Sequence, residues 1–420
     1  MTIGGTVIEV AYEDSRIFFD FGSEYNPASP HQPENLQELL DTRMVPALVN
    51  LFDPDIPLTG YQLQGPNPFS QTAVFLSHVH LDHTKIINYL DPDIPLYALK
   101  GTRSLLKSLN INNDFVFPLH RQKGPDNIRD IIGVEDNETI QVGAIQVKLM
   151  PIDHDAYGAS GFIITTPDLK IAYTGDLRLH GYREADTLAY CAEAKFADVL
   201  LMEGVTISFE EVDAPPEPGK EFKSEPQILK EINEALLADP NRQVTFNYYV
   251  ANIERIVKII ETCPRQVVLD AYSAYVVKDA TGMDVKYYSL APQAYESALN
   301  PALKLPFQEL LADRGTYFWQ LSGPALDHLE QLSPEGLYIH SNAQPLGEFD
   351  PAYLPFMARF EQQGIQVMLA SSTGHAQPKD LIKIIDLIQP KLLVPIHTLK
   401  PERLINKWGD RLLPERGQTI

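Results

Sequence analysis

Three histidines and one aspartate occupy four of six consecutive positions, in the segment His-Val-His-Leu-Asp-His at residues 78–83. Side chains two residues apart in an extended stretch point the same way, so His78 and His80 can bind one metal ion together. Asp82 and His83, in the turn that follows, can reach a second ion. Imidazole and carboxylate are the ligands expected for Zn²⁺, with Mn²⁺ or iron as alternatives. The segment therefore predicts a centre for two divalent metal ions.

Four ligands from one segment cannot complete two sites, so further ligands must come from other parts of the chain. Three downstream residues with suitable side chains each follow a predicted strand: His154, Asp176 and His397. An aspartate offers two oxygens, so Asp176 can bridge both ions. The resulting assignment places His78, His80 and His154 on one ion. It places Asp82, His83 and His397 on the other ion, and Asp176 on both.

Short segments rich in β-branched and aromatic residues precede these candidate ligands, as expected for strands. Residues 6–12 and 16–19 predict a hairpin that ends at Asp20. A strand at residues 73–76 is expected to run directly into the histidine-rich segment, with a helix at residues 83–90. Further strands are predicted at residues 139–150 (two), 161–166, 170–173 and 198–202. The first half of the chain is therefore expected to be a β-rich layer punctuated by helices.

The character of the sequence changes after about residue 208. Residues 210–226 are acidic, rich in proline and without an apolar period, which predicts a linker. The segments that follow alternate helix and strand, and this alternation predicts a parallel α/β unit. Near the end of the chain, residues 379–388 predict a helix and residues 392–396 a strand that leads to His397.

Composition excludes several classes of protein. No run approaches the roughly 18 apolar residues of a membrane span, and the first residues lack the features of a signal peptide, so we expect a cytoplasmic protein without a membrane partner. Only Cys191 and Cys263 occur, which excludes a disulfide framework and a cysteine metal cluster. The net charge of −22 argues against a broad, non-specific nucleic-acid surface, although bound divalent metals would add local positive charge.

The histidine-rich segment, followed by a histidine, an aspartate and a histidine, resembles the metallo-β-lactamase superfamily. Three further segments look like motifs of its β-CASP subfamily, whose members process nucleic acids: Leu-Met-Glu-Gly at 201–204, Ser-Thr-Gly-His-Ala at 372–376 and Val-Pro-Ile-His at 394–397. Residues 3–5, 20–22 and 252–256 also look like ribonuclease J and its relatives. The resemblance covers nearly the whole chain.

The resemblance implies an α/β (α+β) fold, a four-layer αββα sandwich built from residues 1–207 and 366–420. An α/β cap of the β-CASP type, residues 208–365, would be inserted between these parts, with the metals in a cleft between sandwich and cap. Two divalent ions about 3.5–4 Å apart could hold a hydroxide and polarise a phosphodiester for in-line attack.

Further residues receive catalytic and substrate-binding roles from the same resemblance. Asp82 belongs to the catalytic set as well as to the metal ligands. His375 would donate a proton to the leaving oxygen or hold the phosphate, with Glu203 orienting its ring. Asp20 would hydrogen-bond a ligand histidine or its loop from outside the metal sphere. Substrate contacts are expected from three residues: His375, Ser372 and Asn252.

These expectations favour a nuclease that acts on RNA or single-stranded DNA. A hydrolase of a small ester or phosphodiester is the alternative, and a non-catalytic scaffold subunit is a third class. The chain departs from ribonuclease J at Gln377, where a serine usually contacts phosphate, and at Ala251, where serine is usual. We also expect the chain to lack the C-terminal appendage of bacterial ribonuclease J. Endo- against exonucleolytic cleavage, the metal used in the cell and the oligomeric state, a homodimer included, are left open.

Overall fold

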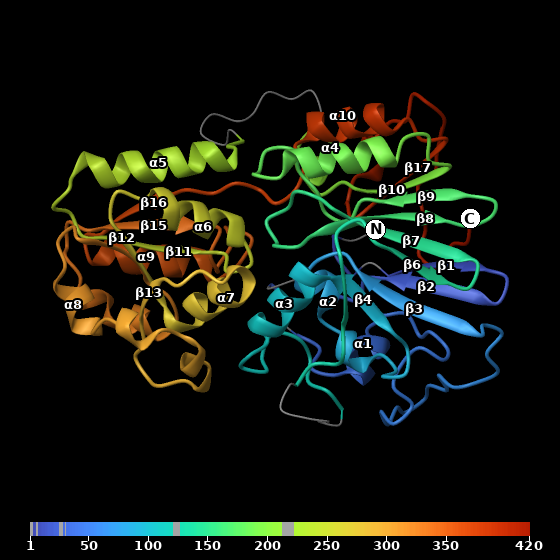
Figure 1. Ribbon diagram of the computed structural model, residues 1–420, viewed down its shortest axis with the longest axis horizontal. Helices are drawn as coiled ribbons and strands as arrows, with labels where there is room; N and C mark the ends of the chain where they lie inside the picture. The colour runs from blue at the N-terminus through green and yellow to red at the C-terminus, as the bar shows by residue number, and fades with distance from the viewer. Residues whose placement is uncertain (1–2, 6, 25–27, 30, 121–126, 212–221) are drawn as a thin grey trace. The chain divides into compact units, whose positions relative to one another are not determined.

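The computed structural model describes the chain apart from residues 1–2, 6, 25–27, 30, 121–126 and 212–221 (Figure 1). The chain divides into two compact units. The first comprises Met1–Asn26, Pro30–Glu221 and Gly374–Ile420, and the second comprises Pro27–Ser29 and Phe222–Thr373. Most of the predicted linker, residues 212–221, lies outside the described residues.

The C-terminal return to the first unit begins later than the sequence predicted. Strand β16 (Gln366–Leu369) was expected to open this return at residue 366. It instead pairs in parallel with β15 (Leu337–Ser341) and forms the edge of the second unit's sheet. The return therefore starts at Gly374. An isolated strand pattern does not reveal which sheet the strand will join, which is why the sequence placed this boundary too early.

Two sheets form the centre of the first unit. The five-stranded sheet has the order β1 (Ile8–Tyr12), β2 (Ser15–Phe19), β3 (Gln71–Leu76), β4 (Leu96–Leu99) and β5 (Ile132–Val134). The seven-stranded sheet has the order β18 (Asp410–Arg411), β17 (Leu392–Ile396), β10 (Val199–Glu203), β9 (Lys170–Tyr173), β8 (Ser160–Thr165), β7 (Ile145–Pro151) and β6 (Thr139–Val142).

Apolar side chains from both sheets meet in one core. Phe19 and Phe75 of the first sheet pack edge-on against Phe162 of the second, and Tyr173 closes the same aromatic group. This burial fixes the face of each strand, because side chains alternate between the two faces of a sheet. The two sheets are therefore the inner layers of a sandwich.

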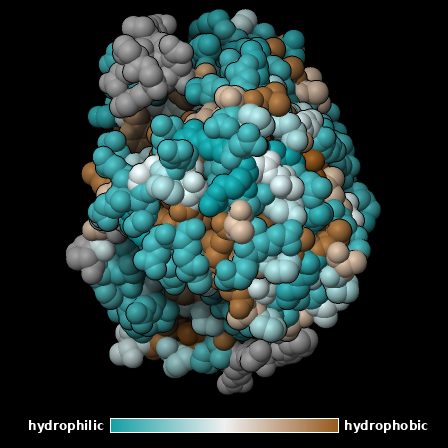
Figure 2. Space-filling view, turned by 90° about the vertical axis from the view of Figure 1, so that its left-hand side faces the viewer, coloured by the Kyte–Doolittle hydropathy of each residue, from teal (hydrophilic) through white to brown (hydrophobic). Residues whose placement is uncertain are grey.

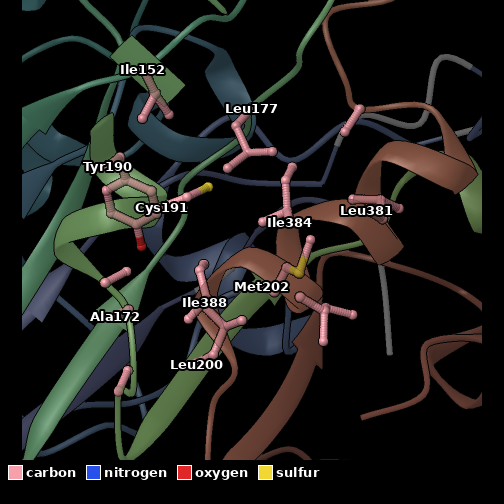
Figure 3. Close-up of a cluster of buried hydrophobic side chains, with 14 of the residues drawn as sticks. Ile152, Ala172, Leu177, Tyr190, Cys191, Leu200, Met202, Leu381, Ile384 and Ile388 are labelled. Atoms are coloured by element: carbon pink, nitrogen blue, oxygen red, sulfur yellow. The ribbon is translucent and has the colours of Figure 1, made fainter. Parts of the chain in front are cut away.

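Helices cover the outer faces. Helices α4 (Glu184–Glu193) and α10 (Pro378–Ile388) pack on the seven-stranded sheet (Figure 1). Figure 3 shows Tyr190 and Cys191 of α4 and Ile384 of α10 in one buried cluster with side chains of the sheet. Helix α3 (Lys100–Leu109) packs on β4 and β5 of the other sheet, and α1 (Leu36–Asp41) is also part of this unit. The first unit is thus an αββα sandwich, as the sequence predicted.

One predicted helix is wrong in its extent. Residues 83–90 do not form a single helix; α2 (Leu81–Thr84) is one turn long, and a short 3₁₀ segment, η1 (Ile87–Tyr89), follows it. The Thr84 hydroxyl donates to the carbonyls of Val79 and His80, and the Ile86 amide donates to Phe21. Because the Ile86 amide bonds to Phe21 and not to the carbonyl four residues earlier, the helix ends early.

The second unit is a parallel α/β sheet with the order β13 (Lys286–Tyr288), β12 (Gln266–Asp270), β14 (Tyr317–Gln320), β11 (Val244–Tyr248), β15 and β16. Its longer helices are α5 (Glu225–Ala238), α6 (Ile253–Thr262), α7 (Ala271–Thr281), α8 (Phe307–Ala312) and α9 (Tyr353–Gln362); short 3₁₀ segments are η3 (Ala294–Ala298), η4 (Pro301–Leu303) and η5 (Gly323–Gln331). Trp319 and Tyr338 are buried between sheet and helices.

Hydrophilic side chains predominate on the face shown in Figure 2, where apolar side chains form small, separate groups. Among the described residues, no helix combines the length and apolar character that a membrane crossing requires.

Candidate metal centre

The candidate ligands follow the ends of neighbouring strands in the first unit. Strand β3 leads to the histidine-rich segment, β7 to His154, β9 to Asp176, and β17 to His397. Strands β9, β10 and β17 pair in parallel, and β7 has the same direction because both β7 and β9 are antiparallel to β8. Carboxyl ends of parallel strands meet at one edge of a sheet, which gathers residues that are distant in sequence.

The histidine-rich segment is held by two other parts of the chain. The amide of Gly5 donates to the carbonyl of Asp82 at 3.1 Å, and the amide of Phe21 donates to that of His83 at 2.7 Å. A Cβ atom at Gly22 would lie 1.8 Å from the Asp82 carbonyl carbon, so only glycine fits against this turn. Residues 3–5 and 20–22, selected from the sequence by resemblance, therefore hold the segment in place.

Four side chains form one candidate metal site: Asp82, His83, Asp176 and His397. His83 Nε2 lies 3.5 Å from Asp82 Oδ2 and 3.2 Å from Asp176 Oδ2. His397 Nε2 lies 3.3 Å and 3.4 Å from the same two oxygens. Donor atoms about 2.0–2.2 Å from a tetrahedral zinc ion are roughly 3.3–3.6 Å apart. These four separations therefore suit a single small divalent cation.

A second set contains His78, His80, His154 and, again, Asp176. His154 Nε2 lies 3.2 Å from His80 Nδ1, and His78 Nε2 lies 3.7 Å from Asp176 Oδ2. The structure thus brings together all seven ligands predicted from the sequence, in the predicted two groups and with Asp176 common to both.

Several of these donor atoms are buried without a well-aligned hydrogen bond among the described residues: His78 Nε2, His83 Nε2 and Asp176 Oδ2. A buried polar atom that has lost water and gained no partner raises the free energy of the folded state, and native proteins rarely leave such atoms unused. Cations bound to these atoms would remove that cost, so the donor set fits two metal ions.

The opposite ring nitrogens of the histidines are bonded to other groups. His154 Nδ1 lies 2.6 Å from the carbonyl of Gly374, and His83 Nδ1 lies 2.9 Å from Asp20 Oδ2. Asp20 Oδ1 also accepts from the Ser77 amide at 2.8 Å. Such outer contacts set which ring nitrogen faces a metal. Asp20 is fully buried and sits where the sequence analysis expected it.

The charges of the site compensate one another. Burial raises the pKa of Asp176, but the imidazoles of His397, His83 and His375 outweigh burial and hold that pKa well below its usual range. Burial lowers the pKa of His83, yet the carboxylates of Asp176, Asp82 and Asp20 raise it well above its usual value. The Asp176 carboxylate therefore stays ionised and attracts positive charge, which a bound cation would supply.

His375 lies beside the metal centre and next to Glu203. Its Nδ1 atom is 3.3 Å from Glu203 Oε1 and 3.8 Å from Asp176 Oδ2. Burial lowers the pKa of His375, but Glu203 and Asp176 outweigh burial and raise it to about 9. Glu203 ends β10, in register with the last residue of β17, just before His397. The contact between His375 and Glu203 that the sequence analysis expected is thus present in the structure.

Asn252 and Ser372, predicted to contact substrate, belong to the second unit and are buried there. Asn252 Oδ1 accepts from the Arg255 amide at the start of α6, and its Nδ2 donates to Glu225. The Ser372 hydroxyl donates to the carbonyl of Lys223, and its amide donates to Asn342. A structural role accounts for these bonds, and a contact to substrate from either residue stays a prediction.

Sequence reasoning missed Asp155, which directly follows His154. Asp155 Oδ1 lies 3.4 Å from His154 Nε2 and 3.5 Å from His80 Nε2. The signal in the sequence was the pair of aspartates that flanks His154. The other member, Asp153, accepts from the Arg178 guanidinium at 2.8 Å and from the Arg183 amide at 2.8 Å, so it serves the surrounding structure.

Comparisons with known proteins show what the chain is similar to. Residues 54–234 match the family described as "Beta-lactamase superfamily domain". The whole chain aligns at 22% identity with 91% of a ribonuclease J from Pyrococcus abyssi. Four fifths of the chain aligns at 22% identity with a ribonuclease J from Thermus thermophilus, of which it spans 59%.

A crystal structure of a protein of unknown function from Enterococcus faecalis is similar at 47% identity and a TM-score of 0.92, covering 99% of this chain and 96% of that one. The similarity therefore extends through both units of the chain.

Proposed function

Because residues 54–234 match the β-lactamase superfamily domain and the chain is similar to ribonuclease J along its length, we propose that it is a metal-dependent hydrolase that cleaves phosphodiester bonds of RNA. The observation that carries this proposal is the pair of donor sets that share Asp176, with donor atoms 3.2–3.7 Å apart. Two divalent cations held there would lower the pKa of a bound water to about 7 and polarise phosphoryl oxygens.

The candidate ligands are proposed to hold the two cations in the two groups described above. His78, His80 and His154 would hold one cation, while Asp82, His83 and His397 would hold the other. Asp176, whose Oδ2 faces residues of both donor sets, would contribute to both. We expect Zn²⁺, with Mn²⁺ as the alternative suited to the carboxylates. Asp20 and the Gly374 carbonyl would fix the ring orientation of two ligands.

His375 is proposed as the proton donor to the leaving oxygen or as a hydrogen-bond donor to the phosphate. Glu203 lies against Nδ1 of the ring, so Nε2 is the nitrogen proposed to meet the substrate. The pKa of about 9 keeps the imidazole protonated at neutral pH in the metal-free protein. Bound cations beside Asp176 would weaken the support that this carboxylate gives to the imidazolium, which would bring the pKa closer to neutrality.

The second unit is proposed to be a β-CASP-type cap that contacts the polynucleotide. Single-stranded DNA is the alternative polymer, because the metal centre itself acts on phosphate and not on the sugar. A small phosphodiester or ester is the second candidate substrate. Three observations favour it: the net charge of −22, Gln377 and Ala251.

A substrate panel tests the proposal. Purified protein loaded with Zn²⁺ or Mn²⁺ is incubated with 5′-labelled RNA, with single-stranded DNA of the same sequence, and with a chromogenic phosphodiester. The proposal expects RNA to be cut in a reaction that EDTA abolishes and metal restores. Metal-dependent turnover of the small reporter alone would replace the RNA proposal by the small-substrate one. Matched Asp176→Asn protein, prepared in parallel, controls for contaminating nucleases.

A further inference from the structure

Asp155 is a buried carboxylate that faces the first donor set. It lies in the connection between β7 and β8, immediately after His154, and is 9% exposed. Its Oδ1 atom is 3.4 Å from His154 Nε2 and 3.5 Å from His80 Nε2. Among the described residues this oxygen has no hydrogen-bond partner. A charged oxygen removed from water without a partner is costly, so a cation is the natural complement.

The position of Asp155 Oδ1 also suits a metal ligand. Its separation from His154 Nε2 matches the roughly 3.3–3.6 Å expected between two ligands of one tetrahedral zinc ion.

We propose that Asp155 is an additional carboxylate ligand of the metal held by His78, His80 and His154, an inference that rests on the proposed function. Each metal would then contact two carboxylates, one of them the shared Asp176. The first metal would have five protein donors and the second would have four. The extra hard, anionic donor would favour Mn²⁺ relative to Zn²⁺ at the first position.

Gly374 makes room for this carboxylate. A Cβ atom at residue 374 would lie 2.2 Å from Asp155 Oδ1 and 2.5 Å from its Cγ. The backbone carbonyl of the same glycine accepts from His154 Nδ1 at 2.6 Å. Any larger residue at position 374 must displace Asp155 from its place beside His154. The glycine of the Gly-His-Ala segment thus has a steric role that is specific to this carboxylate.

The test compares metal binding by the full chain and by its Asp155→Ala variant. Zn²⁺ and Mn²⁺ affinities are measured by competition with a chelator, and bound metal is counted by elemental analysis. We expect at least about a tenfold weaker affinity for one of the two ions, with a larger loss for Mn²⁺ than for Zn²⁺. Asp380→Ala is the matched control, since Asp380 is a half-buried carboxylate of the same unit that faces His180 and lysines.

A spectroscopic measurement distinguishes two roles for Asp155: a ligand of the metal ion, or a partner of the His80 ring that does not contact the metal. Visible absorption bands of Co²⁺-substituted protein gain intensity when a five-coordinate ion becomes four-coordinate, and we expect this gain for Asp155→Ala. Gly374→Ala, which keeps the charge but displaces the carboxylate, should produce the same gain and covers the case in which Asp155→Ala does not fold. An unchanged Co²⁺ spectrum or wild-type affinity for both ions would overturn the proposal.

These outcomes are distinguishable from failure of the proposed function. RNA cleavage by the wild type together with unaltered metal binding by the Asp155 variant would remove only the ligand role. Wild-type protein that binds two ions and cuts no substrate, while the variant shows the expected spectral change, would remove only the nuclease function.

Discussion

Asp20 Oδ2 lies 2.9 Å from His83 Nδ1, which joins the end of β2 to a ligand of the candidate metal centre. The same oxygen accepts hydrogen bonds from the hydroxyls of Ser77 and Tyr173. One buried carboxylate therefore connects the loop before the ligands, the first sheet and the second sheet.

We predict that Asp20→Asn weakens metal binding by roughly 10–100-fold, because the amide can no longer hold the His83 ring as an anionic acceptor. The variant should also lose about 1–3 kcal/mol of unfolding free energy through the disrupted buried network. Chelator competition and urea unfolding measure the two effects. Tyr173→Phe is the control. It removes one hydrogen bond to Asp20, so the free energy of unfolding should fall by about 1 kcal/mol while the metal affinity stays at the wild-type value. Equal metal affinity in Asp20→Asn and wild type would refute the role.

His375→Ala should lower kcat for RNA cleavage by roughly 10²–10⁴-fold, because a positioned proton donor contributes that much to a typical hydrolysis. Metal content should stay at the wild-type level, since His375 belongs to neither donor set. Single-turnover kinetics and elemental analysis provide the measurements. The exposed His31, in the same unit, serves as the control when changed to alanine. Wild-type rates in His375→Ala would exclude this residue as the proton donor.

Removal of metal should destabilise the first unit and spare the second. The seven clustered ligands all belong to the first unit, whereas the second unit has its own apolar core. Free metal at 100–1,000 times its dissociation constant stabilises a folded state by about 2.7–4.1 kcal/mol per site. In calorimetry, EDTA should therefore lower the midpoint temperature of one of two unfolding transitions and leave the other unchanged. An equal shift of both transitions would contradict the prediction, because it would mean that the stability of the second unit also depends on the metal.

Glu225→Gln should destabilise the second unit by roughly 3–5 kcal/mol, because it breaks a buried ion pair and leaves the Arg255 guanidinium without an anionic partner. The Arg255 Nε atom donates to Glu225 Oε2 at 2.8 Å, and both side chains are almost completely buried. Glu234→Gln, at an exposed position of the same helix, should have almost no effect. Chemical unfolding followed by tryptophan fluorescence, with Trp408 of the first unit changed to phenylalanine, reports on this unit through the buried Trp319. A loss below 1 kcal/mol would mean that the pair contributes little.

Four of the seven candidate metal ligands could be chosen from the sequence because their pattern is local. Histidines two residues apart, followed by Asp82 and His83, have a geometry that the strand and turn impose almost alone. Asp155 could not be chosen on the same grounds. Both aspartates beside His154 have the right chemistry, and only the course of the β7–β8 connection turns one toward Arg178 and the other toward the histidines.

The strands were predicted from short apolar segments that are strands in the structure, such as residues 392–396, whereas the sandwich was implied by the resemblance. The boundary at residue 366 failed for a different reason. The pattern of residues 366–369 identifies a strand, but its pairing with β15 depends on contacts made across the second unit. The prediction of a helix at residues 83–90 failed because the Ile86 amide bonds to Phe21, far away in sequence, in place of a helical carbonyl.

The central claim, that two cations share Asp176, is tested most directly by counting metal in wild-type protein and in Asp176→Ala. Both proteins are saturated with Zn²⁺, dialysed, and assayed for bound metal and for RNA cleavage, with folding checked by circular dichroism. The account predicts two ions per wild-type chain, and loss of both tight binding and cleavage in the folded variant. Two tightly held ions in Asp176→Ala, or none in the wild type, would contradict it.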